Sequence, residues 1–150
     1  MNSLNELVIT RLFDAPRELV FKAWTEPERV AQWWGPHGFT SPVCELDVRP
    51  GGAMLITMRS PDGDVYPMQG IFHEIVAPER LVFTTRTLED KAGNFRLEVL
   101  HTVTLADLGG KTRLTLQARV VKSTPEAAGL LTGMEEGWVQ GLERLAESLR

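Results

Sequence analysis

His101 is the residue of this sequence best placed to do chemistry. It lies in a strand-like run at 95–106, in register with the apolar residues Leu97, Val99 and Val103, so its imidazole should point to the same face as theirs. From that face it could give a ligand a hydrogen bond, or a proton near neutral pH. The alternative is a core histidine that is satisfied by a neighbouring backbone or side chain.

Large apolar residues are the remaining site candidates, because they could line a cavity for an apolar or aromatic ligand. Tryptophans make rigid walls for a flat molecule, and methionines adapt to irregular shapes. For both types the alternative is a filled core. With His101, the predicted ligand-binding residues are Trp24, Trp33, Phe39, Leu46, Met54, Ile56, Met58, Met68, Phe72, Phe83, Leu97, Val99, Leu114, Leu116, Met134, Trp138 and Leu142. We assign no catalytic residue.

The alternation of apolar and polar residues supplies the inward strand faces on which several of these candidates lie. Around 66–76 the pattern is ambiguous, because Met68 and Phe72 compete with Ile71 and Ile75 for the inward face. A β-bulge in this run would reconcile the two sets.

Glycines recur every four residues in the last apolar segment, at positions 129, 133, 137 and 141. Each glycine inside a helix costs about 1 kcal/mol relative to alanine, so the row is an odd choice for a helix that needs only stability. One interpretation is that the first two glycines precede a helix that begins near Thr132. The other is that the whole segment is helical and that its weak N-terminal half opens to admit a ligand.

Other kinds of chemistry have no signature in the sequence. His, Cys, Asp and Glu form no cluster with metal-ligand spacing, no glycine-rich phosphate loop opens a helix, and there is no nucleophile elbow. Cys44 has no basic neighbour in the sequence, which predicts a buried, inert thiol. We therefore expect no metal and no cofactor.

Composition restricts the partners and the location. The 150 residues suffice for one domain, 1–150, and the net charge of −4 argues against nucleic acid as the main partner. No apolar run approaches the roughly 20 residues of a membrane span, and the first residues lack the features of a signal peptide. Together with the single cysteine, this predicts a cytoplasmic protein that does not bind membranes.

Two short helices joined by a tight corner are expected near the start of the chain, after a strand at 7–13. The first follows the start signal Asp14-Ala15-Pro16, with the proline in the first turn. The second follows a capping box at Thr25-Glu26-Pro27-Glu28, and Gly35-Pro36 ends it.

Six further strands and a closing helix complete the expected fold. Turn signals separate strands near 40–49, 53–60, 66–76, 80–88, 95–106 and 112–121, and the short connections make neighbours antiparallel. The helix runs within 125–150, and its start is open because Ser123-x-x-Glu126 and Thr132-x-x-Glu135 both fit a capping box. The fold class is α+β, with a curved, seven-stranded antiparallel sheet wrapped around a long C-terminal helix.

Several motifs in this order resemble one known superfamily. They are Asp14 to Phe21, Thr25 to Glu28, Trp33-Trp34-Gly35-Pro36, Asp47 to Gly52, Gly70 to Ile75 followed by Pro78-Glu79-Arg80-Leu81, and Gly137-Trp138 with Leu142 and Leu145. The chain resembles the START-like (SRPBCC, helix-grip) superfamily, in the branch named for the activator of the heat-shock protein ATPase. The resemblance implies a β-α-α-β6-α fold with a deep cavity between sheet and C-terminal helix, in which members bind hydrophobic small molecules and a few cyclise polyketides.

Three functions stay open at this point. The first is a small-molecule binding module, stress- or metabolism-related, with an apolar or aromatic ligand. The second is a cyclase or dehydratase in the same cavity, using His101 and, if strand parity is misjudged, Glu98 or Arg86. The third is a chaperone-associated interaction domain, although the extra N-terminal domain of the eukaryotic co-chaperones is missing, so the sequence does not support chaperone binding. A homodimer is also open.

Overall fold

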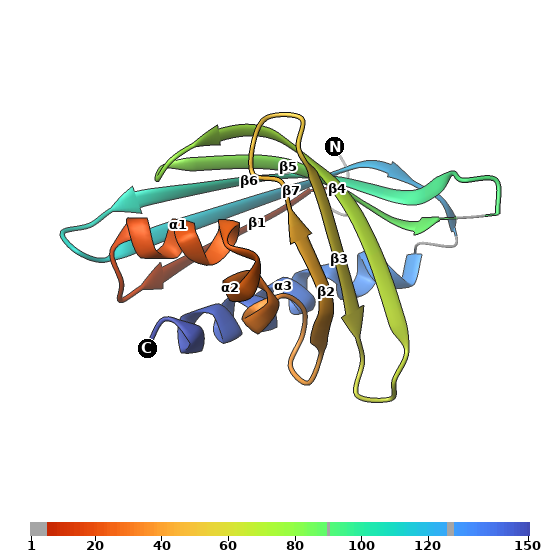
Figure 1. Ribbon diagram of the computed structural model, residues 1–150, viewed down its shortest axis with the longest axis horizontal. Coiled ribbons are helices and arrows are strands. Elements are labelled where there is room, and N and C mark those ends of the chain that lie inside the picture. The colour runs from red at the N-terminus through yellow and green to blue at the C-terminus, as the bar shows by residue number, and fades with distance from the viewer. Residues whose placement is uncertain (1–5, 90, 126–127) are drawn as a thin grey trace.

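The computed structural model describes residues 6–89, 91–125 and 128–150. Within them, one antiparallel sheet has the strand order β1-β7-β6-β5-β4-β3-β2. Its strands are β1 (Glu6–Phe13), β2 (Thr40–Leu46), β3 (Ala53–Arg59), β4 (Val65–Val76), β5 (Arg80–Glu89), β6 (Phe95–Asp107) and β7 (Thr112–Ser123). The helices are α1 (Arg17–Thr25), α2 (Pro27–Trp33) and α3 (Ala128–Ser148). The sheet curves over α3, which runs along its concave side (Figure 1), so the predicted α+β helix-grip fold is confirmed.

The α1–α2 corner forms as expected, but its predicted caps are wrong. Pro16 is the N-cap of α1 rather than part of its first turn, and no side chain caps that helix. The Thr25 hydroxyl donates back to the Phe21 carbonyl at 2.9 Å, so it is already satisfied within α1. The N-cap of α2 is therefore Glu26, whose carboxylate pairs with Arg29 instead.

A bulge in β4 resolves the ambiguous strand. The β4–β5 register shifts between Phe72 and Glu74, which turns the residues after the shift over to the other face. Met68 and Phe72 before it, and Ile75 after it, therefore all pack against the same core. The bulge that the sequence left as a possibility thus brings Met68, Phe72 and Ile75 to one face, whereas Ile71, which precedes it, lies on the other.

The last helix begins at Ala128, earlier than the start near Thr132 that one interpretation of the glycine row required. Because α3 starts at Ala128, the glycine row lies inside it, and the proposal of a loop ahead of a helix at Thr132 is wrong. The alternative capping box at Ser123-x-x-Glu126 ends on a residue that lies outside the described ones. Among the described helices, none is long and apolar enough to cross a membrane.

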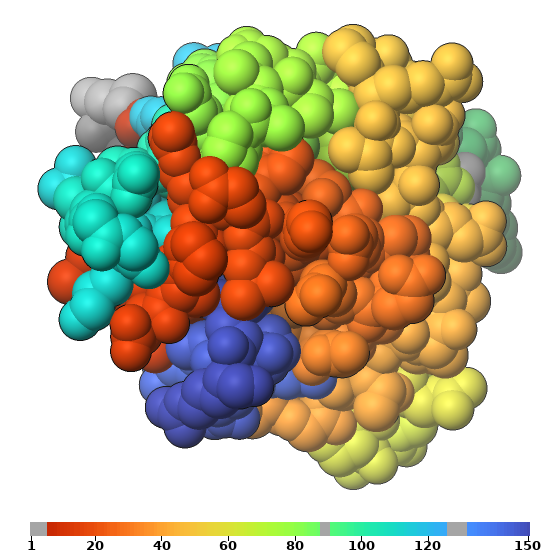
Figure 2. Space-filling view, turned by 60° about the vertical axis from the view of Figure 1, so that its left-hand side comes forward, coloured from red at the N-terminus to blue at the C-terminus, as the bar shows by residue number. Residues whose placement is uncertain are grey.

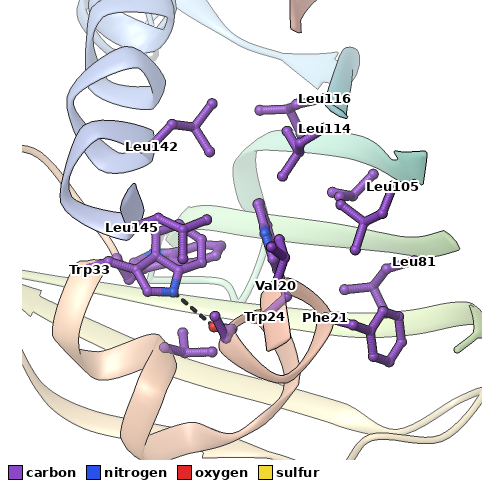
Figure 3. Packing of buried hydrophobic residues seen from close by; sticks show 14 of the residues in the cluster. Val20, Phe21, Trp24, Trp33, Leu81, Leu105, Leu114, Leu116, Leu142 and Leu145 are labelled. Atoms are coloured by element: carbon purple, nitrogen blue, oxygen red, sulfur yellow. Dashed lines mark hydrogen bonds between the residues drawn. The ribbon is translucent and has the colours of Figure 1, made fainter. Parts of the chain in front are cut away.

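A solid core fills one end of the space between the sheet and the helices. Leu142 and Leu145 of α3 pack there with Leu114 and Leu116 of β7, all at most 1% exposed. The α1–α2 corner closes this end, and the Trp33 indole Nε1 donates to the Ala23 carbonyl at 2.8 Å (Figure 3). Seen from this side, α1, α2 and the end of α3 form a continuous surface (Figure 2).

Candidate functional site

A pocket of about 640 Å³ lies at the other end, between the concave face of β3–β6 and the N-terminal half of α3. This volume is typical of small-molecule sites, which span roughly 300–1,000 Å³. The loop after α2 supplies part of the rim. The lining residues are Trp34, Gly35, Pro36, Met58, Val65, Tyr66, Pro67, Met68, Gln69, Thr85, Thr87, Phe95, Leu97, Val99, His101, Gly133, Met134, Gly137, Trp138 and Gly141.

The glycine row of α3 is one reason why this end is hollow. A Cβ atom at Gly133 would have no neighbour within 4 Å, and one at Gly137 would only reach Pro36 at 4.0 Å. The volume that side chains would occupy at these two positions is therefore empty. At Gly141 the row does something different, because a Cβ there would already contact the Gly35 carbonyl at 3.7 Å. The helix backbone thus widens the pocket at one point and approaches its rim closely at another.

On the sheet side of the pocket, several inward-facing residues are small. Thr85 on β5 lies between Gly70 on β4 and Val99 on β6. The next inward row along the strands is Met68, Thr87 and Leu97. A second, smaller hydrophobic cluster surrounds this part of the wall, formed by Leu97, Val99 and Ala118 with Leu7, Val120 and Met134 packed against it.

His101 stands where the solid core meets the pocket. Its ring stacks on Phe83 at 4.7 Å and meets the Trp138 ring edge-on at 5.5 Å. It is 3% exposed, and its Nδ1 atom has no hydrogen-bond partner. Burial lowers the pKa of His101 to about 3, against smaller opposing contributions from the backbone of Phe83 and Val99. The imidazole is therefore neutral at neutral pH, and it is not the proton source that the sequence suggested.

Besides Tyr66 and Gln69, two threonines supply polar side chains to the wall. Thr85 is 8% exposed. The hydroxyl oxygen of Thr87 is buried and, like His101 Nδ1, has no partner. A buried polar atom without a partner costs about 1–3 kcal/mol, so a ligand group that reached either atom and bonded to it would relieve this cost. The interpretation of His101 as a core histidine fits its burial and the backbone hydrogen bonds at Phe83 and Val99 that raise its pKa, although its Nδ1 atom has no partner of good geometry.

Arg144 fastens the pocket rim to α3. Its guanidinium donates to the carbonyls of Trp34, Gly35 and Pro36 at 3.2, 3.0 and 3.0 Å, and to that of Gln32 at 3.1 Å. These carbonyls lie at and beyond the C-terminal end of α2, where a cation is favourable. Desolvation lowers the pKa of the guanidinium from its usual value.

Two further contacts hold the same loop. The His37 amide donates to Gln140 at 3.1 Å, and the His37 ring lies 3.1 Å from the Glu143 carboxylate. The His37 ring is half-exposed and has this carboxylate as its partner. The loop that carries Trp34 and Pro36 into the pocket is thus held by three side chains from little more than one turn of α3, Gln140, Glu143 and Arg144.

The structure separates the predicted site residues into two groups. Those that line the pocket are Met58, Met68, Leu97, Val99, His101, Met134 and Trp138. Those buried in the solid core instead are Trp24, Trp33, Met54, Ile56, Phe72, Phe83, Leu114, Leu116 and Leu142. Leu46 packs on the edge of that core, and Phe39 lies half-buried beside Tyr66. Inward parity was correct for most of these, but it does not say which part of an inward face is filled.

Sequence reasoning missed several lining residues. They are Trp34, Gly35, Pro36, Val65, Tyr66, Pro67, Gln69, Thr85, Thr87, Phe95, Gly133, Gly137 and Gly141. The four-residue spacing of glycines was a usable signal for three of them. No sequence signal pointed to the role of Arg144, because the carbonyls that it binds lie 108 to 112 residues away in the sequence.

Other candidates for chemistry lie outside the pocket. Arg86 and Glu98 face each other across β5 and β6 at 3.4 Å and do not line it, so strand parity was not misjudged there. Cys44 is half-buried, and burial, with help from the Glu28 carboxylate, raises the pKa of its thiol to about 11. Among the described residues, no group of His, Cys, Asp and Glu could hold a metal ion.

Comparison with known proteins gives a consistent picture. A family model described as Activator of Hsp90 ATPase homolog 1-like protein matches residues 14–150. A search of curated proteins finds no match. A crystal structure of a protein from Nitrosomonas europaea has 28% sequence identity and a TM-score of 0.79, covering 99% of this chain and 96% of that one.

Two further solved structures show the same similarity. A protein from Chromobacterium violaceum has 29% identity and a TM-score of 0.81, covering 97% of each chain. The AHSA1 protein from Silicibacter pomeroyi has 25% identity and a TM-score of 0.78, covering 96% of each chain.

Proposed function

The chain belongs to the Activator of Hsp90 ATPase homolog 1-like family, and from this premise we propose that it binds an apolar or aromatic small molecule in the pocket between the sheet and α3. One observation carries the proposal. The walls are apolar and aromatic, yet they contain a buried polar atom without a partner, His101 Nδ1. A shaped apolar space with a small number of polar groups is the usual form of a ligand site. We place this activity in the cytoplasm, where Cys44 stays reduced.

The energetics favour a ligand of modest size. Burial of apolar surface contributes about 25 cal/mol per Å², so a molecule that buries roughly 300 Å² gains about 7 kcal/mol. Association costs at least about 4 kcal/mol of translational and rotational freedom. The net affinity therefore depends on the ligand satisfying the polar atoms of the wall as well as filling the space.

Binding suits the pocket better than catalysis does. A cyclase or dehydratase normally needs a group that gives and takes protons near neutral pH. His101 and Tyr66 are the titratable residues among the described lining ones, and the pKa of His101 lies near 3. A chaperone-associated role has only the family name behind it, and we do not propose it for this chain.

Filling the pocket from the helix tests the proposal. Freshly purified protein is first examined by native mass spectrometry for a copurifying molecule and is then titrated with N-phenyl-1-naphthylamine, which fluoresces when it enters an apolar site. In Gly133→Leu the new side chain grows into the open space beside Gly133, and we expect the affinity to fall at least about tenfold, or 1.4 kcal/mol.

The matched control places the same side chain on the exposed side of the same helix. Glu135 is exposed and does not line the pocket, so Glu135→Leu should keep the wild-type affinity. Equal binding by the wild type and both folded variants would show that the dye sits elsewhere, and the pocket would lose its assigned role.

A further inference from the structure

The pocket wall is uncharged. None of the described lining residues is Asp, Glu, Lys or Arg, and the buried imidazole of His101 is neutral at neutral pH. Arg144 lies behind the rim, but its guanidinium is committed to the backbone carbonyls of Gln32, Trp34, Gly35 and Pro36. A charged group that entered this space would therefore leave water without gaining a counter-ion from these residues.

Two lining residues at separate points of the wall, His101 and Thr87, each hold a buried polar atom without a partner. His101 Nδ1 lies beside Trp138, at the margin of the solid core, and Thr87 Oγ1 lies one strand away, towards the other end of the pocket. Thr87 pairs with Leu97, and Phe83 pairs with His101. Four residues of strand separate the two positions, which is about 13 Å at 3.3 Å per residue. The two atoms therefore offer a rigid ligand one hydrogen-bonding position at each end of the pocket.

We propose that the pocket selects uncharged, flat molecules that carry a hydroxyl group, and that it excludes their ionised analogues. This inference rests on the proposed function and adds the chemical class of the ligand. Aromatic rings at Trp34, Phe95 and Trp138 present surfaces that suit a flat molecule. The polar group of the ligand bonds to His101 at the closed end or to Thr87 at the other.

A hydroxyl group fits both anchors better than a carbonyl or an amine does. Neutral imidazole carries its proton on one of the two ring nitrogens, so Nδ1 either donates or accepts. A hydroxyl can do both, and it can also both donate to and accept from the Thr87 hydroxyl. A ligand carbonyl, by contrast, can only accept. Recognition by a hydroxyl therefore does not depend on the imidazole tautomer.

A matched series of three probes tests the selectivity. Naphthalene, 2-naphthol and 2-naphthoate share a ring system and differ in having no polar group, a neutral hydroxyl or a carboxylate at pH 7. Each competes against N-phenyl-1-naphthylamine for the wild-type protein. We expect 2-naphthol to bind at least about tenfold more tightly than 2-naphthoate, because an unpaired buried charge is costly.

Two variants and a control identify the anchors. His101→Phe keeps a ring to stack on Phe83, and Thr87→Val keeps the shape of the side chain. If it removes the anchor in use, each should weaken 2-naphthol binding about three- to tenfold more than it weakens naphthalene binding. Thr10 on the outer face of β1 is exposed, so Thr10→Val should change nothing. Thr87→Val keeps the test decisive if the histidine variant does not fold.

The outcomes separate the inference from the proposed function. If 2-naphthoate competes as well as 2-naphthol, or if neither anchor variant changes the preference for the hydroxyl, the inference is wrong while the pocket remains a binding site. If the wild-type protein binds neither N-phenyl-1-naphthylamine nor any of the three arenes, the proposed function itself fails. Preference for 2-naphthol that is lost in an anchor variant supports the inference.

Discussion

The two ends of α3 face opposite kinds of environment. Near its C-terminus, Leu142 and Leu145 are buried against the sheet and the α1–α2 corner. Near its N-terminus, Gly133 faces open space and Met134 is only partly buried. The same sheet covers both ends (Figure 1). The difference arises because α1 and α2 fill one end of the concavity with aromatic side chains, whereas glycines keep the other end open.

In this helix-grip fold, one end of α3 packs the core and the other end lines the pocket. The filled end supplies the stability that holds the sheet curved, and so the open end need not be packed. Arg144 lies at the junction, since it joins the helix to the rim of the pocket. Substitutions at the two ends should therefore have different consequences, and the following measurements test that expectation.

The largest effect is expected at the filled end. Leu145 is fully buried, and Leu145→Ala should lower the free energy of unfolding by about 3–4 kcal/mol, because it leaves a cavity in a close-packed core. Met134→Ala, at the open end, should cost only about 1 kcal/mol, because that side chain already borders empty space. Urea denaturation measures both. Similar losses for the two variants would contradict the division of α3 into a filled and an open end.

Acid should lower the free energy of unfolding through His101, which lies between the filled core and the pocket. Burial lowers the pKa of His101 from 6.5 to about 3, so between these values the unfolded chain binds a proton that the native protein does not. The free energy of unfolding therefore falls as the pH drops through this window, by about 3 kcal/mol at pH 4 from this residue. The contribution of His101 disappears about one pH unit above 6.5, where the unfolded chain no longer protonates it.

The difference between wild type and His101→Phe isolates this contribution from that of the carboxylates. Unfolding is measured at intervals from pH 7 to pH 4, and the variant should lose less stability than the wild type across that range. Parallel curves for the two proteins would mean that the His101 ring is solvated or paired in solution, and it would no longer serve as an unpartnered anchor.

The next effect concerns the link between the ends. Arg144→Met keeps an apolar stem but removes the donors to four carbonyls, and we expect a loss of about 2 kcal/mol in unfolding free energy. Arg144→Lys should recover only part of it, since an ammonium cannot reproduce the planar fork of donors. The same substitutions at Arg150, which is exposed at the end of the chain, are the control. A full recovery by lysine would show that charge alone, rather than the geometry of the fork, fastens the rim.

The sequence predicted the elements well and the boundary between filled and open ends poorly. Leu97 and Leu114 both stand on inward faces with the same alternation, yet one lines the pocket and the other lies in the core. Which part of a concave face is filled depends on where α1 and α2 return, and that is a long-range property with no local pattern.

Polar lining residues were hidden for a different reason. The run Thr84-Thr85-Arg86-Thr87 is polar on both faces, so it offers no contrast from which an inward side can be chosen. The inward direction of Thr85 and Thr87 follows from their register with Val99 and Leu97, which is known only once the strands are paired. The glycine row, by contrast, was visible, because its cost to a helix is a local property.

The smallest effect is a gain, and it distinguishes empty space from close packing most directly. At Gly133 an added methyl group meets nothing within 4 Å, so Gly133→Ala should raise the free energy of unfolding by about 0.5–1 kcal/mol through helix propensity alone. At Gly35, across the rim, φ is +98° and a Cβ would lie 2.7 Å from the Met58 sulfur, so Gly35→Ala should destabilise the protein. Opposite signs in urea denaturation are expected from two glycines that line the same pocket. If Gly133→Ala is also destabilising, then the space beside α3 is occupied in solution by the helix packing down onto the sheet, and the open end closes when no ligand is present.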